Sequence, residues 1–90
     1  MKVLKFGAVW CSSCLVMSPR WQKIEKEYPV FESEYFDYDT SPKEVEKYGI
    51  EDGSLPTFIF LDKQENEIER VSGEISEKKL VELVNNYKDK

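Results

Sequence analysis

Two cysteines, Cys11 and Cys14, are the residues of this sequence best suited to chemistry. They are the only cysteines of the chain, and two residues separate them. A structural disulfide across so short a loop would stabilise the fold little, because its effect on the unfolded chain grows with the length of the closed loop. Two adjacent thiols can instead exchange disulfides, since one attacks a disulfide and the other resolves the mixed disulfide. The spacing therefore favours redox chemistry.

The same spacing is also half of many zinc sites, so a metal role has to be weighed. A structural zinc ion takes four ligands, mostly from cysteine and histidine. The chain has two cysteines and no histidine, so a closed site would need two carboxylates or a second chain. We therefore expect no metal ion, and dithiol exchange itself requires no cofactor.

The elements around the two cysteines place Cys11 where a strand meets a helix. The apolar run 3–6 before Gly7 is typical of a strand. Apolar residues then recur in steps of three and four, which predicts a helix that Pro29 ends, with one apolar face made of Cys14, Met17, Trp21, Ile24 and Tyr28. Reactive groups often lie at the carboxyl end of a strand, and a helix N-terminus stabilises a thiolate. Cys11 is therefore predicted to be the nucleophile and Cys14 the resolving thiol.

The rest of the sequence predicts three more strands and two more helices. The strand-like runs are 30–38, 57–61 and 67–71. Between the first two runs, Ser41 is expected to cap a short helix, Glu44 to complete a capping box and Gly49 to end it. Ser76 is expected to cap the final helix, which has the apolar stripe Leu80, Leu83, Val84 and Tyr87.

This order of elements predicts the fold class. The expected order is strand, helix, strand, helix, strand, strand, helix. It indicates an α/β domain in which the first two strands pair in parallel and the last two form an antiparallel hairpin. We expect a four-stranded mixed sheet with helices on both faces. The length of 90 residues suits one such domain, spanning 1–90.

Charge and the N-terminal sequence limit the partners. The net charge is −5, and no basic run is longer than Lys78-Lys79. The chain therefore lacks the electrostatic footprint of a protein that binds nucleic acid or an anionic membrane. The first residues show no long apolar segment of the kind found in export signals. We expect a cytoplasmic protein, in a compartment where thiols are kept reduced.

The segment around the cysteines resembles the active-site segment of thioredoxins. Residues Phe6-Gly7-Ala8-Val9-Trp10-Cys11-Ser12-Ser13-Cys14 follow the family pattern Phe-x-Ala-x-Trp-Cys-x-x-Cys. Further matches follow in the family's order at Pro19, Asp39, Lys47-Tyr48-Gly49-Ile50, Leu55-Pro56-Thr57 and Gly73. The resemblance covers nearly the whole chain and implies a thioredoxin-like fold.

The resemblance also implies a site for substrate. Thioredoxins hold the proline that corresponds to Pro56 in the cis form beside the disulfide, and the backbone of the preceding residue, here Leu55, pairs with an extended substrate. Gly73 corresponds to the glycine after the last strand of the family. Trp10 is expected at the rim of the site, in a small apolar patch with Val9, Leu55 and Ile75.

Two positions depart from the family pattern. Lys5 stands where thioredoxins usually carry a buried acid that helps to move the proton of the second cysteine, and Tyr35 stands where they often carry a lysine. One interpretation makes Lys5 a structural lysine that is paired with Asp37 or Asp39. In the other, Lys5 tunes the ionisation of Cys14, either as a cation or as a proton acceptor.

The predicted function is a protein-disulfide reductase in which Cys11 attacks and Cys14 resolves. Such an enzyme serves electron transport and cell redox homeostasis; we expect a monomer that acts on protein disulfides and is recycled by a donor resembling thioredoxin reductase. Two alternatives stay open: a glutaredoxin-like, glutathione-dependent reductase, and a redox-inert binding module with a thioredoxin fold. The chain begins on the active-site strand, without the leading strand and helix of the family.

Overall fold

The computed structural model describes residues 1–90, and its centre is one four-stranded sheet. The elements follow one another as β1 (Lys2–Gly7), α1 (Ser12–Glu27), β2 (Glu32–Asp37), α2 (Pro42–Tyr48), a 3₁₀ turn (Asp52–Ser54), β3 (Thr57–Leu61), β4 (Glu67–Ser72) and α3 (Glu77–Tyr87). The predicted order of strands and helices is confirmed.

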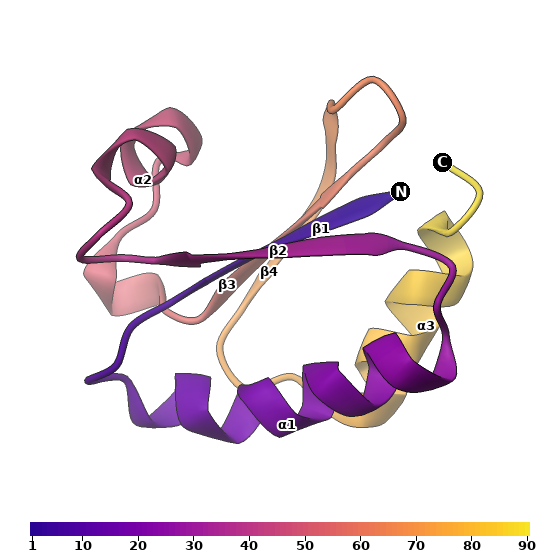
Figure 1. The fold of residues 1–90 in the computed structure, drawn as a ribbon, viewed down its shortest axis with the longest axis horizontal. Helices are drawn as coiled ribbons and strands as arrows, with labels where there is room; N and C mark the ends of the chain where they lie inside the picture. Colours follow the sequence, from indigo (N-terminus) through magenta and orange to yellow (C-terminus); the bar gives the residue numbers. More distant parts are fainter.

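The sheet is mixed, as expected, and its strands lie in the order β2-β1-β3-β4. β1 pairs with β2 in parallel and with β3 in the antiparallel sense, and β3 and β4 form the antiparallel hairpin. Helices α1 and α3 cover one face of the sheet and α2 lies on the other (Figure 1). The first strand therefore lies in the middle of the sheet and ends beside the start of α1.

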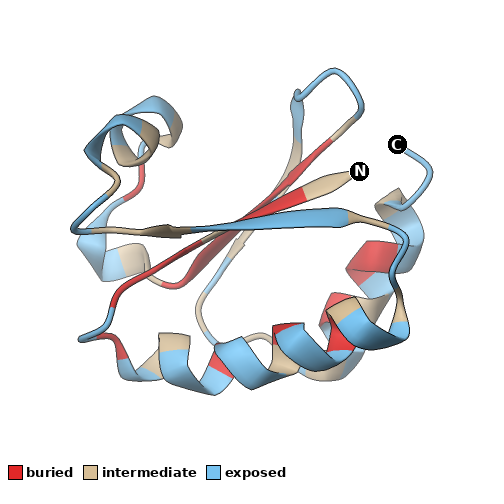
Figure 2. Ribbon diagram, viewed as in Figure 1, coloured by how far each residue is buried: buried red, intermediate tan, exposed pale blue.

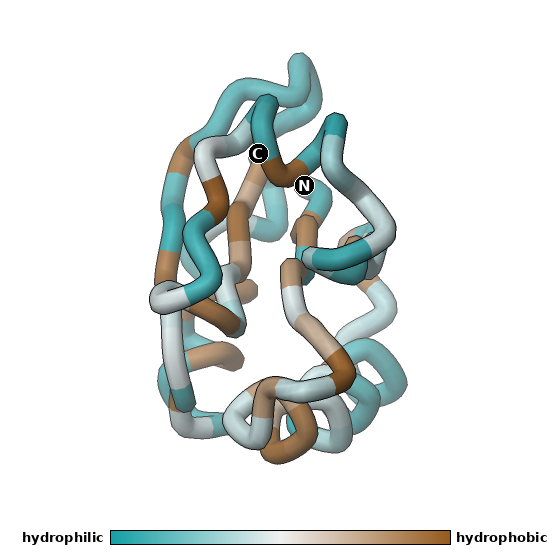
Figure 3. The backbone as a smooth tube through the Cα atoms, turned by 90° about the vertical axis from the view of Figure 1, so that its left-hand side faces the viewer, coloured by the Kyte–Doolittle hydropathy of each residue, from teal (hydrophilic) through white to brown (hydrophobic).

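The core has two layers, one on each face of the sheet. Alternation along β1 sends Val3 into the layer under α1 and α3, and Leu4 into the layer under α2. Every residue of β3 is buried, whereas β2 is largely exposed (Figure 2). Hydrophobic stretches occur both in the sheet and in the helix at the bottom of the view, and the loop at the top is hydrophilic (Figure 3). None of the helices has the length and apolar character needed to cross a membrane.

Two local predictions differ from the structure. The second strand is shorter than the predicted run 30–38, because the N–H of Val30 bonds to the carbonyl of Tyr28 in a turn. Ser41 makes no side-chain capping bond, so the predicted capping box is wrong. Its ψ of 58° departs from the extended backbone that aims a capping side chain at the helix, whereas Ser76, at ψ 152°, accepts from the N–H of Lys79 at 3.2 Å as predicted.

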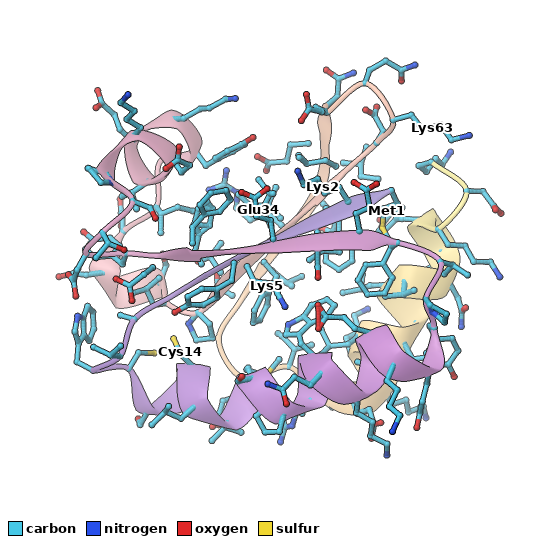
Figure 4. The ribbon with its side chains drawn as sticks, in the orientation of Figure 1. Met1, Lys2, Lys5, Cys14, Glu34 and Lys63 are labelled. Carbon is cyan, nitrogen blue, oxygen red and sulfur yellow. The ribbon has the colours of Figure 1, made fainter.

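Lys5 joins the sheet to the first helix. It lies on β1 and its side chain extends towards α1 (Figure 4). Its Nζ lies 2.8 Å from Oε1 of Glu25, and the hydroxyl of Ser33 donates to the same carboxylate. The predicted partners, Asp37 and Asp39, are therefore wrong. The face of β1 that carries Lys5 points at the helix, so the carboxylate comes from α1.

The Lys5–Glu25 pair should stabilise the fold, because the two side chains are only 17% and 27% exposed. Lys5→Met would leave the Glu25 carboxylate partly buried without its cation, at a cost of about 1–3 kcal/mol in the free energy of unfolding. The double variant Lys5→Met/Glu25→Leu should recover much of that loss. Urea unfolding of the wild type and both variants measures this, and equal stability of Lys5→Met and the wild type would contradict it.

Candidate active site

Cys11 is the residue that caps the N-terminus of α1. Its backbone is extended, at φ −96° and ψ 110°, and its Sγ accepts the backbone N–H of Cys14 at 3.2 Å. The N–H of Cys11 bonds to the carbonyl of Ala8 at 3.2 Å, which closes the turn after β1. A sulfur that accepts a backbone N–H at the positive end of a helix dipole is well placed to carry negative charge.

Cys14 lies one turn into the helix, and its surroundings oppose ionisation. Burial, and next the hydrogen bond with Cys11, raise the pKa of the Cys14 thiol to about 11. The group is therefore a neutral thiol at physiological pH. Both cysteines are free. Cys11 is 8% exposed and Cys14 is half-buried, so their different electrostatics, rather than their exposure, separate their chemistry.

The predicted substrate residues come together beside the cysteines. The Leu55–Pro56 peptide bond is cis, as expected, and Pro56 and Cys14 line the same cavity. The N–H of Gly73 donates to the carbonyl of Pro56 at 2.8 Å. Gly73 has a φ of 85°, a left-handed conformation that glycine adopts readily. The loops before β3 and after β4 are thus joined next to Cys14.

Trp10 lies at the rim, as predicted, with 55% of its surface exposed. Its Nε1 donates to Oδ2 of Asp39 at 2.7 Å, and its ring meets that of Tyr38 edge-on at 6.3 Å. The only role that the sequence indicated for Asp39 was that of a possible partner of Lys5; in the structure it orients the tryptophan instead. Val9 and Leu15 are also exposed, so apolar side chains near the two cysteines in the sequence are open to solvent.

Lys5 and Tyr35 both line the cavity next to Cys14. The Nζ of Lys5 is held by Glu25, and Lys5 is not among the groups that shift the pKa of Cys14. Tyr35 lies near the sulfur. Its hydroxyl lies 3.1 Å, and the Sγ of Cys14 3.2 Å, from the point that a Cβ on Gly7 would occupy.

The electrostatics of Tyr35 reflect this position. Burial, followed by the charges of Asp37, Cys14 and Cys11, raises the pKa of the Tyr35 phenol. The phenol therefore stays protonated at neutral pH. The sequence offered one signal for this contact, since alternation in two paired strands places Tyr35 directly opposite Lys5 on the same face.

The comparisons with known proteins all indicate the same family. Residues 1–86 match the family model described as Thioredoxin. The chain is 35% identical over 71 residues to Thioredoxin H5 of Oryza sativa subsp. japonica, covering 79% of this chain and 50% of that protein. It is 31% identical over 85 residues to the thioredoxin of Chlamydia muridarum, covering 94% of this chain and 80% of that protein. The chain therefore spans half the length of the first relative and most of the second.

Solved structures agree with the sequence comparison. The X-ray structure of Fasciola hepatica thioredoxin superposes with a TM-score of 0.85 at 32% identity, covering 96% of this chain and 79% of that chain. The thioredoxin-2 described as a component of malaria parasite protein secretion machinery has a TM-score of 0.87 at 29% identity, covering 96% and 82%. The similarity therefore includes the sheet, the helices and the segment that carries both cysteines.

The two thiols should react with an alkylating reagent at very different rates. Because the pKa of Cys14 is raised to about 11, the group is protonated below that pH, and roughly one molecule in a thousand carries its thiolate at pH 8. Iodoacetamide should therefore modify Cys11 at least roughly tenfold faster than Cys14 near pH 8, and Cys14 should become reactive as the pH approaches 11. Peptide mass spectrometry of the reduced protein measures both rates, and equal rates at pH 8 would contradict the assignment.

Proposed function

We propose that this chain, which belongs to the thioredoxin family, is a protein thiol–disulfide oxidoreductase that reduces protein disulfides through Cys11 and Cys14. One observation carries the proposal: Cys11 caps α1 with its sulfur on the N–H of Cys14, and Cys14 shares a cavity wall with the cis-proline Pro56. The nucleophile, the resolving thiol and the substrate loop thus lie together at one end of the sheet.

In the first step the Cys11 thiolate attacks one sulfur of a substrate disulfide. A bond forms between Cys11 and that sulfur, and the other substrate sulfur leaves as a thiolate that takes a proton from solvent. The N–H of Cys14 and the helix dipole stabilise the attacking thiolate.

In the second step Cys14 resolves the mixed disulfide. Its thiol loses a proton, and its sulfur attacks Cys11 Sγ, which forms the Cys11–Cys14 disulfide and releases the substrate as a thiolate. Two electrons have then passed from the dithiol to the substrate. Because the Cys14 thiol is neutral until this step, the second thiolate does not compete with the first for the substrate.

Substrate docks on the apolar rim beside Cys11. Trp10 is fixed by Asp39 rather than free to rotate, and Val9 and Leu15 extend the exposed apolar surface around it. An extended segment of the substrate pairs with the backbone at Leu55, next to Pro56, and the glycine loop at Gly73 forms the opposite side.

The direction and setting of the reaction follow from cysteine usage. The chain carries the reactive pair and no other cysteine, which suits a cytoplasm that keeps thiols reduced. There the protein acts as a monomeric reductase. Its disulfide is returned to the dithiol by an electron donor of the thioredoxin-reductase type, and this exchange requires no bound cofactor in the chain itself.

The proposal predicts how two cysteine variants differ. With dithiothreitol as the electron source, the wild type should accelerate reduction of a disulfide-linked protein, and Cys11→Ser should lower the rate to the background because the attacking sulfur is gone. Cys14→Ser, reduced beforehand and then freed of dithiothreitol, should instead accumulate a covalent mixed disulfide with the substrate, because the first step proceeds and no second thiol is present to resolve it. Turbidity of the reduced substrate and non-reducing electrophoresis measure the two outcomes.

A redox titration separates the proposed direction from its alternatives. The protein is equilibrated in graded dithiol/disulfide buffers while tryptophan fluorescence and free thiols are followed. A strongly reducing midpoint supports a reductase, whereas an oxidising midpoint points to a disulfide donor. The absence of a reversible Cys11–Cys14 couple would leave only a redox-inert binding module. Faster turnover with glutathione than with a thioredoxin reductase would favour the glutaredoxin-like alternative.

A further inference from the structure

A cavity of about 230 Å³ lies beneath Cys14, between α1 and the sheet. Its wall includes Cys14 and Trp21 from the helix, Lys5 and Gly7 from β1, and Tyr35 from β2. Figure 4 shows the same arrangement: Cys14 lies at the start of α1, and Lys5 projects from β1 towards that helix. The volume accommodates several water molecules, and the wall offers them polar partners.

One polar atom in this wall has no partner in the protein. Nε1 of Trp21 is the only buried side-chain nitrogen or oxygen without a hydrogen bond, and the residue is 1% exposed. A buried N–H donor is costly unless an acceptor satisfies it, and ordered water is the usual acceptor where the cavity is large enough. Water in the cavity would satisfy this donor.

Tyr35 presents its hydroxyl to Cys14 across the backbone of Gly7. The two polar atoms lie 3.1 and 3.2 Å from the same point, the place where any side chain at Gly7 would begin. Glycine at position 7 therefore keeps the phenol and the thiol next to each other without an intervening carbon. In the reduced protein the two atoms form no hydrogen bond, which leaves the hydroxyl free for an anion that forms later.

The other charged and titratable groups around Cys14 are already engaged or face elsewhere. On β1, Lys5 is paired with Glu25 of α1. On β2, Oδ1 of Asp37 accepts the N–H of Asp39, and Oδ2 of Asp39 accepts Nε1 of Trp10. Neither carboxylate lines the cavity, to which β3 contributes only Phe58 and the loop before β3 only Pro56. Apart from Cys14 itself, the phenol of Tyr35 is thus the one titratable group of the cavity wall that has no ion pair or hydrogen bond within the protein.

We propose that Tyr35 is a further catalytic residue of the resolving step, and that its hydroxyl donates a hydrogen bond to Cys14 Sγ as that sulfur becomes a thiolate. The inference rests on the proposed dithiol function. The proton of Cys14 passes to water in the cavity and on to solvent. The thiolate, held by the phenol, attacks Cys11 Sγ and forms the disulfide, and the departing substrate thiolate takes up a proton from solvent. Tyr35 keeps its own proton throughout.

The test separates the two steps with a symmetrical aromatic disulfide that releases a coloured thiolate. Attack by Cys11 releases one coloured thiolate, and resolution by Cys14 releases the second, so stopped-flow absorbance records two phases. Tyr35→Phe should leave the first phase unchanged and slow the second about tenfold at pH 7, since it removes a hydrogen bond to a charged group. The pH profile of the second phase should move up by about one unit.

Two further variants make the result specific. Tyr28→Phe removes a phenol from outside the cavity and should change neither phase. Gly7→Ala keeps the phenol but places a methyl group between it and the sulfur, and it should slow the second phase as Tyr35→Phe does. This second variant carries the test if Tyr35→Phe does not fold, which circular dichroism would reveal.

The outcomes are distinct. A second phase in Tyr35→Phe with the wild-type rate and pH profile would overturn the role of Tyr35 while both phases still supported dithiol exchange. Equal slowing of both phases would also overturn it, because a general structural defect acts on both steps. A wild type that releases neither coloured thiolate would overturn the dithiol function itself and this inference with it.

Discussion

The packing of Trp21 against the sheet is the contact on which the site depends. Its ring lies 5.3 Å from that of Phe58 and 6.2 Å from that of Phe60, and the side chain is 1% exposed. Trp21 lies two turns after Cys14 on the same apolar face of α1. Burial of this one side chain therefore fixes how far the start of the helix stands from β1. Both the position of the resolving thiol and the depth of the cavity beneath it follow from that distance.

Much of this arrangement could be predicted because it depends on patterns within short stretches of the sequence. Steps of three and four located α1 and α3, and runs rich in apolar, β-branched and aromatic residues located the strands. The two cysteines, the cis-proline and the rim tryptophan were found from their order along the chain, and the structure brings these residues together at one end of the sheet. Gly49 ends α2 in the left-handed conformation that its position predicted.

The errors and omissions share a physical cause. Ser41 has the residue type of a cap, but capping also requires an extended backbone, which the preceding turn does not supply. The partner of Lys5 and the neighbour of Tyr35 come from elements distant in the chain, so their identity depends on how α1 crosses the sheet. Patterns within one element indicate on which face of that element a residue lies. Which residue of another element it contacts depends on how the elements pack together.

The outer strands of the sheet have a consequence for association. β2 and β4 are the two edges, and an open edge can recruit a strand from another chain. Glu32 and Glu34 are exposed on β2, and Glu67 is exposed on β4. Glu34 pairs with Lys2 at 3.1 Å and Glu67 with Arg70 at 2.8 Å. Both edges thus carry charged side chains, which discourage pairing with a further strand. The charged side chains along both edges therefore favour a sheet that stays four-stranded.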